Sequence, residues 1–188
     1  LLILLVLAIM LSASSWIALG TVKAHRWALL GASLAAITVG GGLTLALITQ
    51  LVLQMDPWYL PRYVIPLAGM AFANAMTAVS LAAERLSAEL RHESDWSKSR
   101  LTAYQAAMIP VINSLFAVGL VSLPGMMTGQ ILAGSPPLEA AKYQLMILLL
   151  IAAGTGFGAA AAVWLGSRRL FDERQRLRLD RLGSKRPS

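Results

Sequence analysis

Residues 143–166, YQLMILLLIAAGTGFGAAAAVWLG, form an apolar run that contains no charged side chain. A helix needs about 20 predominantly apolar residues to cross the hydrocarbon core of a bilayer, and this run is long enough. A helix that is apolar on all sides is stable either in the centre of a large protein or in lipid. The run therefore predicts a transmembrane helix and an integral membrane protein.

Four further apolar runs precede it, at residues 1–20, 28–53, 63–83 and 106–123. Of the 188 residues, 57% are apolar and 13% are charged, whereas an ordinary soluble domain has about 25% charged residues. We therefore expect an all-α, polytopic integral membrane bundle with at least five transmembrane helices. The first run lacks the basic leader and initiator Met of a secretory signal, so we interpret it as a span in a chain that starts further upstream.

Basic residues alternate between the loops in the pattern that sets membrane orientation. Lys23 and Arg26 follow the first run, four basic residues follow the third, and eight follow the fifth. The intervening loops hold only Arg62 and Lys142. The pattern predicts a permease domain over residues 1–169, with its start outside, and a cytoplasmic tail over 170–188.

Residues 168–188, which include the tail, hold eight basic and three acidic residues and so carry most of the net charge of +7. Leucines among its arginines favour a basic amphipathic helix that lies on anionic lipid. Nucleic acid is the other partner that such arginines suggest. Because a cytoplasmic tail of a membrane protein is ordinarily basic, we expect membrane lipid as a partner and no nucleic acid.

Several kinds of chemistry are missing from the sequence. It has no cysteine, which excludes disulfides and thiolate metal sites. No carboxylate falls in the middle of a predicted span, which argues against a proton-coupled carrier. No nucleophile, base and orienting residue form a recognisable set. We therefore expect no catalytic residue and no cofactor bound by this chain.

Polar side chains within the spans gather in the third run and in and after the fourth. A polar group inside a bilayer must find a partner or line a wet path, so these residues are candidates for a transport pathway. The candidates that could also contact a metal are Met126, Met127 and Gln130. The full predicted pathway set is Asn74, Met76, Thr77, Asn113, Ser114, Met126, Met127, Thr128 and Gln130.

Prolines and glycines interrupt the helical pattern. Pro110 and Pro124 bracket the fourth run and each removes a backbone donor. We expect the chain to break near Pro124, either as a broken or re-entrant segment facing a cavity or as an external turn with Met as gap filler. The triplet Gly40–Gly42 predicts a bend or a tight helix crossing, and Gly154 with Gly158 predicts close packing or dimerisation.

The segment 84–105 joins the third and fourth runs on the predicted cytoplasmic side. It is helical in pattern and carries four acidic and four Lys or Arg residues. Glu89 is correctly spaced to pair with Arg85. The segment is either a solvated extension of the spans or a docking element that receives force from a cytoplasmic motor, and composition does not decide between them.

Three stretches carry a family resemblance: 66–86, PLAGMAFANAMTAVSLAAERL; 110–114, PVINS; and 119–134, GLVSLPGMMTGQILAG. They resemble the FetB/YbbM family of ABC permeases implicated in iron export, which is similar to the plant aluminium-tolerance permeases. The resemblance is strong over residues 60–170 and weaker before them. The family that this chain resembles has further spans at the start and a longer loop after the Glu84-Arg85-Leu86 helix. Either residues are omitted from this sequence, which is the interpretation that we favour, or the docking element is shortened.

The resemblance implies a transport subunit of a bacterial plasma (inner) membrane that works by alternating access. The sequence has no glycine-rich phosphate loop, so ATP and Mg would bind to a separate cytoplasmic ABC ATPase. A second permease copy and a metal ion or metal complex as cargo are the other implied partners. The alternatives are an ATP-independent channel or carrier, an ABC permease for another cargo, or a scaffold without cargo. The residues expected to couple to the ATPase are Glu84, Arg85, Glu89 and Arg91.

Overall fold

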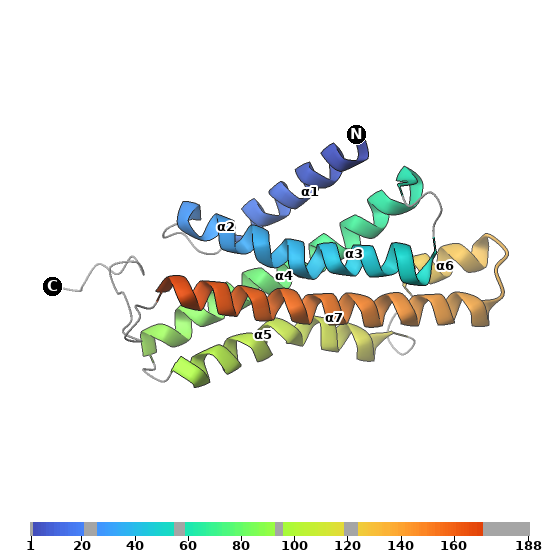
Figure 1. Cartoon of the computed structure of the whole chain (residues 1–188). Helices are drawn as coiled ribbons and strands as arrows, with labels where there is room; N and C mark the ends of the chain where they lie inside the picture. The colour runs from blue at the N-terminus through green and yellow to red at the C-terminus, as the bar shows by residue number, and fades with distance from the viewer. Residues whose placement is uncertain (1, 21–25, 55–58, 93–95, 119–123, 171–188) are drawn as a thin grey trace.

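The computed structural model describes residues 2–20, 26–54, 59–92, 96–118 and 124–170. The helices in these ranges are packed side by side along one long axis (Figure 1). No strand element occurs in the described ranges, which confirms the all-α class. The predicted tail beyond residue 170 and the side chain of Arg91 lie outside what the structure describes.

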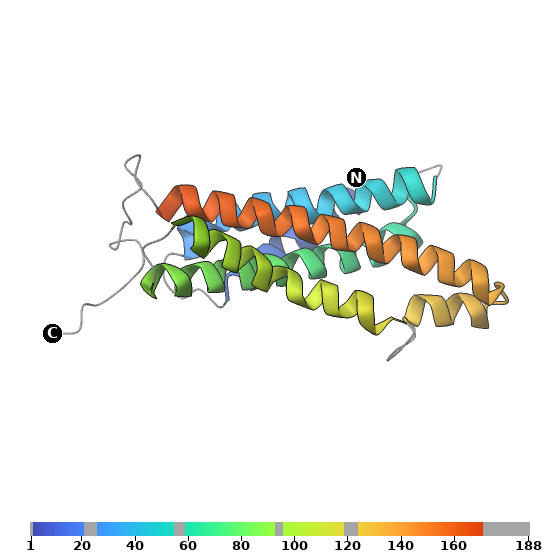
Figure 2. The same cartoon turned by 90° about the horizontal axis from the view of Figure 1, so that it is seen from below.

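Two very long helices, α4 (Pro61–His92) and α7 (Pro137–Leu170), run through the bundle. The 34 residues of α7 span about 50 Å, more than the roughly 30 Å of a hydrocarbon core. Both helices therefore extend beyond any membrane that they cross. They pack against each other over much of their length, as the two orthogonal views in Figures 1 and 2 show.

The chain between residues 26 and 52 is one continuous helix built from four parts. These are α2 (Arg26–Ile37), the π-helical turn η1 (Thr38–Gly42), α3 (Leu43–Leu47) and a second π-helical turn, η2 (Ile48–Val52). The preceding helix, α1 (Leu2–Ala18), packs against α2 and α4. We refer to residues 26–52 as the long N-terminal helix.

Within the described ranges, three stretches are long and apolar enough to cross a membrane: Leu30–Val52, Pro61–Glu89 and Pro137–Arg168. They coincide with the second, third and fifth predicted spans. The first predicted span corresponds to the shorter apolar helix Leu2–Ala18. The fourth overlaps the second half of α5 (Trp96–Ala117), which is not one of the three stretches, and residues 119–123 of this run lie outside the described ranges. That the first and fourth runs cross the membrane therefore stays a prediction.

Pro110 does not interrupt its helix. It lies inside α5, which starts at Trp96 and continues to Ala117. A proline within a transmembrane helix is tolerated where neighbouring groups satisfy the freed backbone atoms. The chain does break before Pro124, which stands as the residue preceding α6 (Gly125–Leu132) with an extended backbone, ψ 138°.

The segment after Pro124 is a short helix that continues beyond the end of α5 and does not turn back into the bundle (Figure 2). The chain reverses only after α6, where it enters α7. The sequence left open a broken or re-entrant segment or an external turn, and the structure has a broken path in which a short helix follows Pro124. We call this end of the molecule the α6 end, and the opposite end, where α4 and α5 are joined by residues 93–95, the hairpin end.

Gly134 ends α6 with a backbone that only glycine adopts without strain. Its φ is +93°, and its amide donates to the carbonyl of Ile131 at 3.0 Å while the amide of Ser135 donates to that of Gln130 at 2.9 Å. These two bonds form a Schellman motif, which satisfies carbonyls at the helix end. The tight reversal into α7 depends on this motif.

Replacing Gly134 with alanine is expected to loosen α6 locally. An alanine at positive φ costs about 1 kcal/mol, so amide hydrogen exchange over residues 125–134 should become about fivefold faster. The matched control is Gly129→Ala within α6, where an added Cβ meets nothing within 4 Å and exchange should slow down. Equal exchange in the two variants would show that the reversal does not depend on Gly134.

The interior of the bundle is apolar. One cluster joins α1, the long N-terminal helix, α4 and α7, and includes Ile37, Phe72 and Ile147. A second cluster of mostly small residues joins α4, α5 and α7, and includes Ala82, Ala107 and Ala159. Small side chains allow the helix backbones to approach closely, which is how helices pack in the absence of a hydrophobic effect between them.

Candidate functional site

The α4 helix leaves one stripe of its surface uncovered by the rest of the protomer. Pro66, Ala73, Thr77 and Glu84 are all exposed, and their spacing of seven, four and seven residues places them on one side of the helix. Thr77 lies near the middle of the candidate span 61–89. Its hydroxyl donates to the carbonyl of Ala73 at 2.9 Å and remains open to the outside.

The neighbouring helix α5 has an uncovered stripe of its own. Asn113 and Ser114 are exposed there, between the exposed side chains of Ile109 and Phe116. The Ser114 hydroxyl donates to the carbonyl of Pro110 at 2.8 Å. Polar and large apolar side chains therefore alternate on this surface, which no described part of the chain covers.

These polar groups lie at a similar height along the bundle. The helices α4 and α5 pack against each other and run in opposite directions from residues 93–95 (Figure 2). Thr77 and Asn113 stand at nearly equal distances along them from that joint. We call Thr77, Asn113 and Ser114 the polar face. The hydroxyls of Thr77 and Ser114 are satisfied within their own helices. The exposed amide of Asn113 is unfavourable against hydrocarbon, so we expect water or another polypeptide beside this face.

The remaining predicted pathway residues of α4 turn towards the interior. Asn74 is half-buried and its Nδ2 donates to the carbonyl of Met70 at 2.8 Å. Met76 packs against the cluster that contains Ile37 and Phe72. The structure therefore divides the predicted set between an outer face and the packed interior, and does not gather it in one enclosed chamber.

The residues predicted for metal contact lie on α6. Met126 is half-buried and packs against the same apolar cluster as Met76. Met127 and Gln130 are also half-buried, but they are not part of this cluster. Thr128 is exposed, and its hydroxyl donates to the carbonyl of Pro124 at 3.2 Å. Within the described ranges, no group of three His, Asp or Glu residues gathers. Thioethers and amide oxygens are the donors that α6 offers, and they hold transition metals weakly compared with imidazole or carboxylate.

The predicted coupling residues lie on the hairpin end of α4. Arg85 and Glu89 form an ion pair, with 2.7 Å between Nη2 and Oε1, as their spacing predicted. Glu84 is exposed beside them. The segment 84–105 is the tip of a helical hairpin that comprises the end of α4 and the start of α5. At this position, the segment can be an extension of the spans and a docking surface at the same time.

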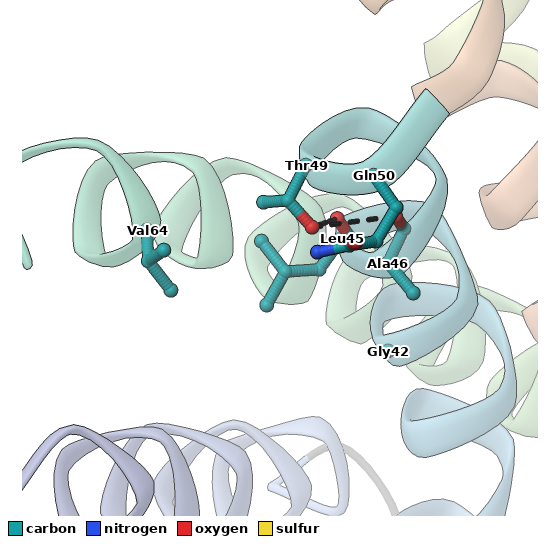
Figure 3. A pocket seen from close by; sticks show the side chains of 6 residues that line it. All are labelled: Gly42, Leu45, Ala46, Thr49, Gln50 and Val64. Atoms are coloured by element: carbon teal, nitrogen blue, oxygen red, sulfur yellow. Dashed lines mark hydrogen bonds between the residues drawn. The ribbon is translucent and has the colours of Figure 1, made fainter. Parts of the chain in front are cut away.

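A cavity of about 380 Å³ lies between the long N-terminal helix and α4. Figure 3 shows its polar side chains, Thr49 and Gln50, on the helix and Val64 of α4 across from them. The Thr49 hydroxyl donates to the carbonyl of Leu45 at 2.9 Å, so it is already satisfied. None of the predicted pathway residues lines this cavity. Its lining consists of Gly42, Leu45, Ala46, Thr49, Gln50 and Val64.

Two buried polar residues on α7 were missed by the sequence analysis. Gln144 is 7% exposed and Thr155 is 4% exposed. Their side-chain oxygens Oε1 and Oγ1 make no hydrogen bond within the described part of the protein. The signal was present in the sequence, because these two polar residues interrupt the apolar run 143–166.

Comparison with known proteins identifies the family. The model of the "Uncharacterised protein family (UPF0014)" matches residues 1–171. The chain is also 33% identical over 190 residues to the UPF0014 membrane protein slr1647 of Synechocystis, an alignment that covers 93% of this chain and 73% of that protein. The chain belongs to the UPF0014 family. This UPF0014 protein is thus a membrane protein by family, in agreement with its apolar helices.

Two further relatives have names that refer to transport or metals. The UPF0014 chain is 36% identical over 168 residues to the "Probable iron export permease protein FetB" of Escherichia coli, covering 81% of this chain and 64% of FetB. It is 31% identical over 141 residues to "Protein ALUMINUM SENSITIVE 3" of Arabidopsis thaliana, covering 66% of this chain and 51% of the plant protein. The UPF0014 chain thus spans between half and three quarters of the length of these relatives. No solved structure matches it.

Proposed function

We propose that this chain is the membrane-spanning permease subunit of an ABC transporter that exports iron or a related metal ion. The similarity to FetB supports the class of cargo. The polar face is the observation that carries the proposal, because Thr77 is exposed near the middle of a candidate span and the exposed amide of Asn113 lies at a similar height on α5. A transport pathway supplies the water that these groups require.

A second copy of the permease completes the pathway in this proposal. A two-fold dimer brings the same surface of both copies together, so the polar face of one protomer would lie across the pathway from that of the other. Exposed apolar neighbours such as Ile109 and Phe116 would then pack between the copies. Half-buried Asn74 and the α6 residues Met127, Thr128 and Gln130 would guide the cargo towards the α6 end.

The energy source is a separate ATPase in this proposal, since the sequence has no phosphate-binding loop. The hairpin end of α4 and α5 is the proposed docking surface, where Glu84 and the Arg85–Glu89 pair are available. Because α4 is one unbroken helix from Pro61 to His92, a push at this end is transmitted along the helix that carries Thr77. The hairpin end and the tail are cytoplasmic in the orientation that the loop charges predict.

Weak metal ligation suits a pathway from which the cargo must leave. Oxygen donors and thioethers can replace part of a hydration shell, and they bind less firmly than carboxylates or imidazoles. Conduction requires binding sites that are weak enough to release the ion. The thioethers of Met126 and Met127 and the amide oxygen of Gln130 meet this requirement, because they bind a metal ion more weakly than the ligands of a permanent metal site.

The proposal is tested with inverted membrane vesicles that contain the full-length protein and its co-purifying ATPase. We expect labelled iron to accumulate only when ATP is hydrolysed. Parallel assays with manganese and with glutathione would establish the class of cargo. Iron flux that persists at the same rate without ATP would instead identify a channel or carrier. A protein that binds no ATPase and moves none of the three substrates would be a scaffold.

A further inference from the structure

The two unpaired oxygens on α7 stand out against the other buried hydroxyls of the bundle. Buried serines and threonines in membrane helices ordinarily donate to a carbonyl three or four residues back. Thr155 could do the same with the carbonyl of Ile151, yet it does not. The buried hydroxyls that do form such a bond are those of Ser15, Ser33, Thr44, Thr49 and Ser167.

Gln144 and Thr155 lie on the same face of α7. They are eleven residues apart, which is about three helical turns or roughly 16 Å. Ile147 and Ile151 lie between them and belong to the apolar cluster that the long N-terminal helix also contributes to. The face therefore has an oxygen at two heights, separated by a dry apolar layer. An unpaired buried oxygen is unfavourable in a packed interior. This face of α7 would therefore be more stable in an arrangement in which both oxygens accept hydrogen bonds.

The long N-terminal helix packs against α7 next to Thr155. A Cβ added at Gly40 would lie 2.6 Å from the Gly154 carbonyl oxygen and 2.8 Å from Gly158 Cα, so the backbones touch here. Small residues allow this close approach, and the Thr44 side chain fills the space where a Cβ on Gly154 would lie. The helix is also irregular at this level, with π-helical turns at Thr38–Gly42 and Ile48–Val52, and such turns are frequent at functional sites.

The cavity of about 380 Å³ lies beside the same helix. Gly40 and Thr44 face α7, whereas the cavity is lined by Gly42, Ala46 and Thr49, which are on another side of the helix because of its 100° step. The helix therefore has a close contact with α7 on one side and space on the other. Movement into that space would uncover the α7 face.

We propose that Gln144 and Thr155 contact water or the cargo when the long N-terminal helix moves into this cavity, and that Ile147 and Ile151 close the path between them in the packed state. This inference rests on the proposed transport function and adds a site on α7 to it. The ligand class is a hydrated metal cation or its water shell, because an amide and a hydroxyl oxygen bind such a shell without displacing all of it. The resulting cycle alternates between a state in which both oxygens are dry and one in which they are wet.

The absence of cysteine in the sequence allows a direct test with single cysteines. Gln144→Cys and Thr155→Cys in the full-length protein, in native membrane vesicles with the ATPase, would be treated with a small water-soluble maleimide with and without Mg-ATP. We expect both positions to react at least about fivefold faster in one nucleotide state than in the other. The matched control is Ser15→Cys, a buried position whose hydroxyl is paired at 2.9 Å, which should stay unreactive in both states.

A second measurement separates contact with cargo from a structural role. Thr155→Val and Gln144→Met keep the side-chain volume and remove the unpaired oxygen, so the unfolding temperature should stay the same or rise. Metal export should fall about tenfold or more in the same variants. Unchanged export, or a fall in unfolding temperature that parallels the loss of export, would indicate a structural oxygen and overturn the inference.

The two proposals fail in different ways. If neither cysteine on α7 reacts in any nucleotide state while export still depends on ATP, the α7 site is wrong and the transport function stands. If iron flux does not depend on ATP, the transport proposal fails in the vesicle assay, whichever cysteines react.

Discussion

Replacing Gly40 with alanine is expected to destabilise the bundle by about 3 kcal/mol or more, near the upper end of overpacking effects. The added Cβ would lie 2.6 Å from the Gly154 carbonyl oxygen and 2.8 Å from Gly158 Cα. Both neighbours are backbone atoms of α7, so no side-chain rotation relieves the clash. The expected observations are a lower unfolding temperature of the purified protein in detergent and a smaller folded yield from membranes.

The matched control for this substitution is Gly42→Ala, two residues away on the same π-helical turn. A Cβ at Gly42 would have only Thr38 Cγ2 nearby, at 3.8 Å. Alanine favours helix over glycine by about 1 kcal/mol, so this variant should be as stable as the natural protein or more so. If both variants unfold at the natural temperature, the crossing between the long N-terminal helix and α7 is not as close as the structure shows.

The double variant Thr77→Val with Asn113→Leu is expected to reduce metal export by about tenfold or more while the protein stays folded. Each polar group that interacts with water or cargo contributes about 0.5–1.5 kcal/mol, and an apolar lining disfavours water in a narrow path. The exposed position of both residues means that no internal packing is lost. Export from inverted vesicles and the unfolding temperature are measured on the same preparation.

Thr38→Val is the matched control for the polar face. Thr38 is also exposed, and its hydroxyl donates to the carbonyl of Leu34 at 2.7 Å, which closely resembles the bond of Thr77 to Ala73. It lies on η1 of the long N-terminal helix, a segment that packs against α4 and α7, and its own side chain is exposed. Its substitution should leave export unchanged. Natural export in the double variant, or an equal loss in Thr38→Val, would remove the polar face from the pathway.

Several local features followed from the sequence because they depend on near neighbours in the chain. The Arg85–Glu89 pair and the break before Pro124 are set by spacing and by the missing donor of proline. A break was predicted near Pro124 alone, and α5 continues through Pro110. A proline stops a helix in water more effectively than in a bundle where neighbours support the backbone.

The glycine patterns were ambiguous in the sequence and acquired a meaning from packing. Gly40 touches α7, and a Cβ on Gly41 would lie 2.5 Å from the ring of Phe72 on α4, so the triplet is a tight crossing and is also distorted into a π-helical turn. Gly154 and Gly158 are used in the same crossing within one chain. A spacing of four residues does not reveal which helix will pack against it.

The candidate site shows the same limit. Nine polar and methionine residues were selected as a pathway, yet Thr77 and Asn113 face outward while Met76 and Met126 pack inward. The side on which a residue lies depends on which faces of α4, α5 and α6 are covered by neighbours. Gln144 and Thr155 became candidates only because the structure leaves their oxygens buried without a partner.

The sequence by itself determined that this protein is an all-α membrane protein, because the length and apolarity of its runs leave lipid as the only suitable solvent for them. It also determined local features such as the Arg85–Glu89 pair, since side-chain spacing acts over a few residues. The tertiary structure alone decided which helices touch, which polar groups remain uncovered and which oxygens remain unpaired. These properties arise from contacts between residues that are far apart in the chain, and apolar helices of similar composition give no sequence signal that specifies their neighbours.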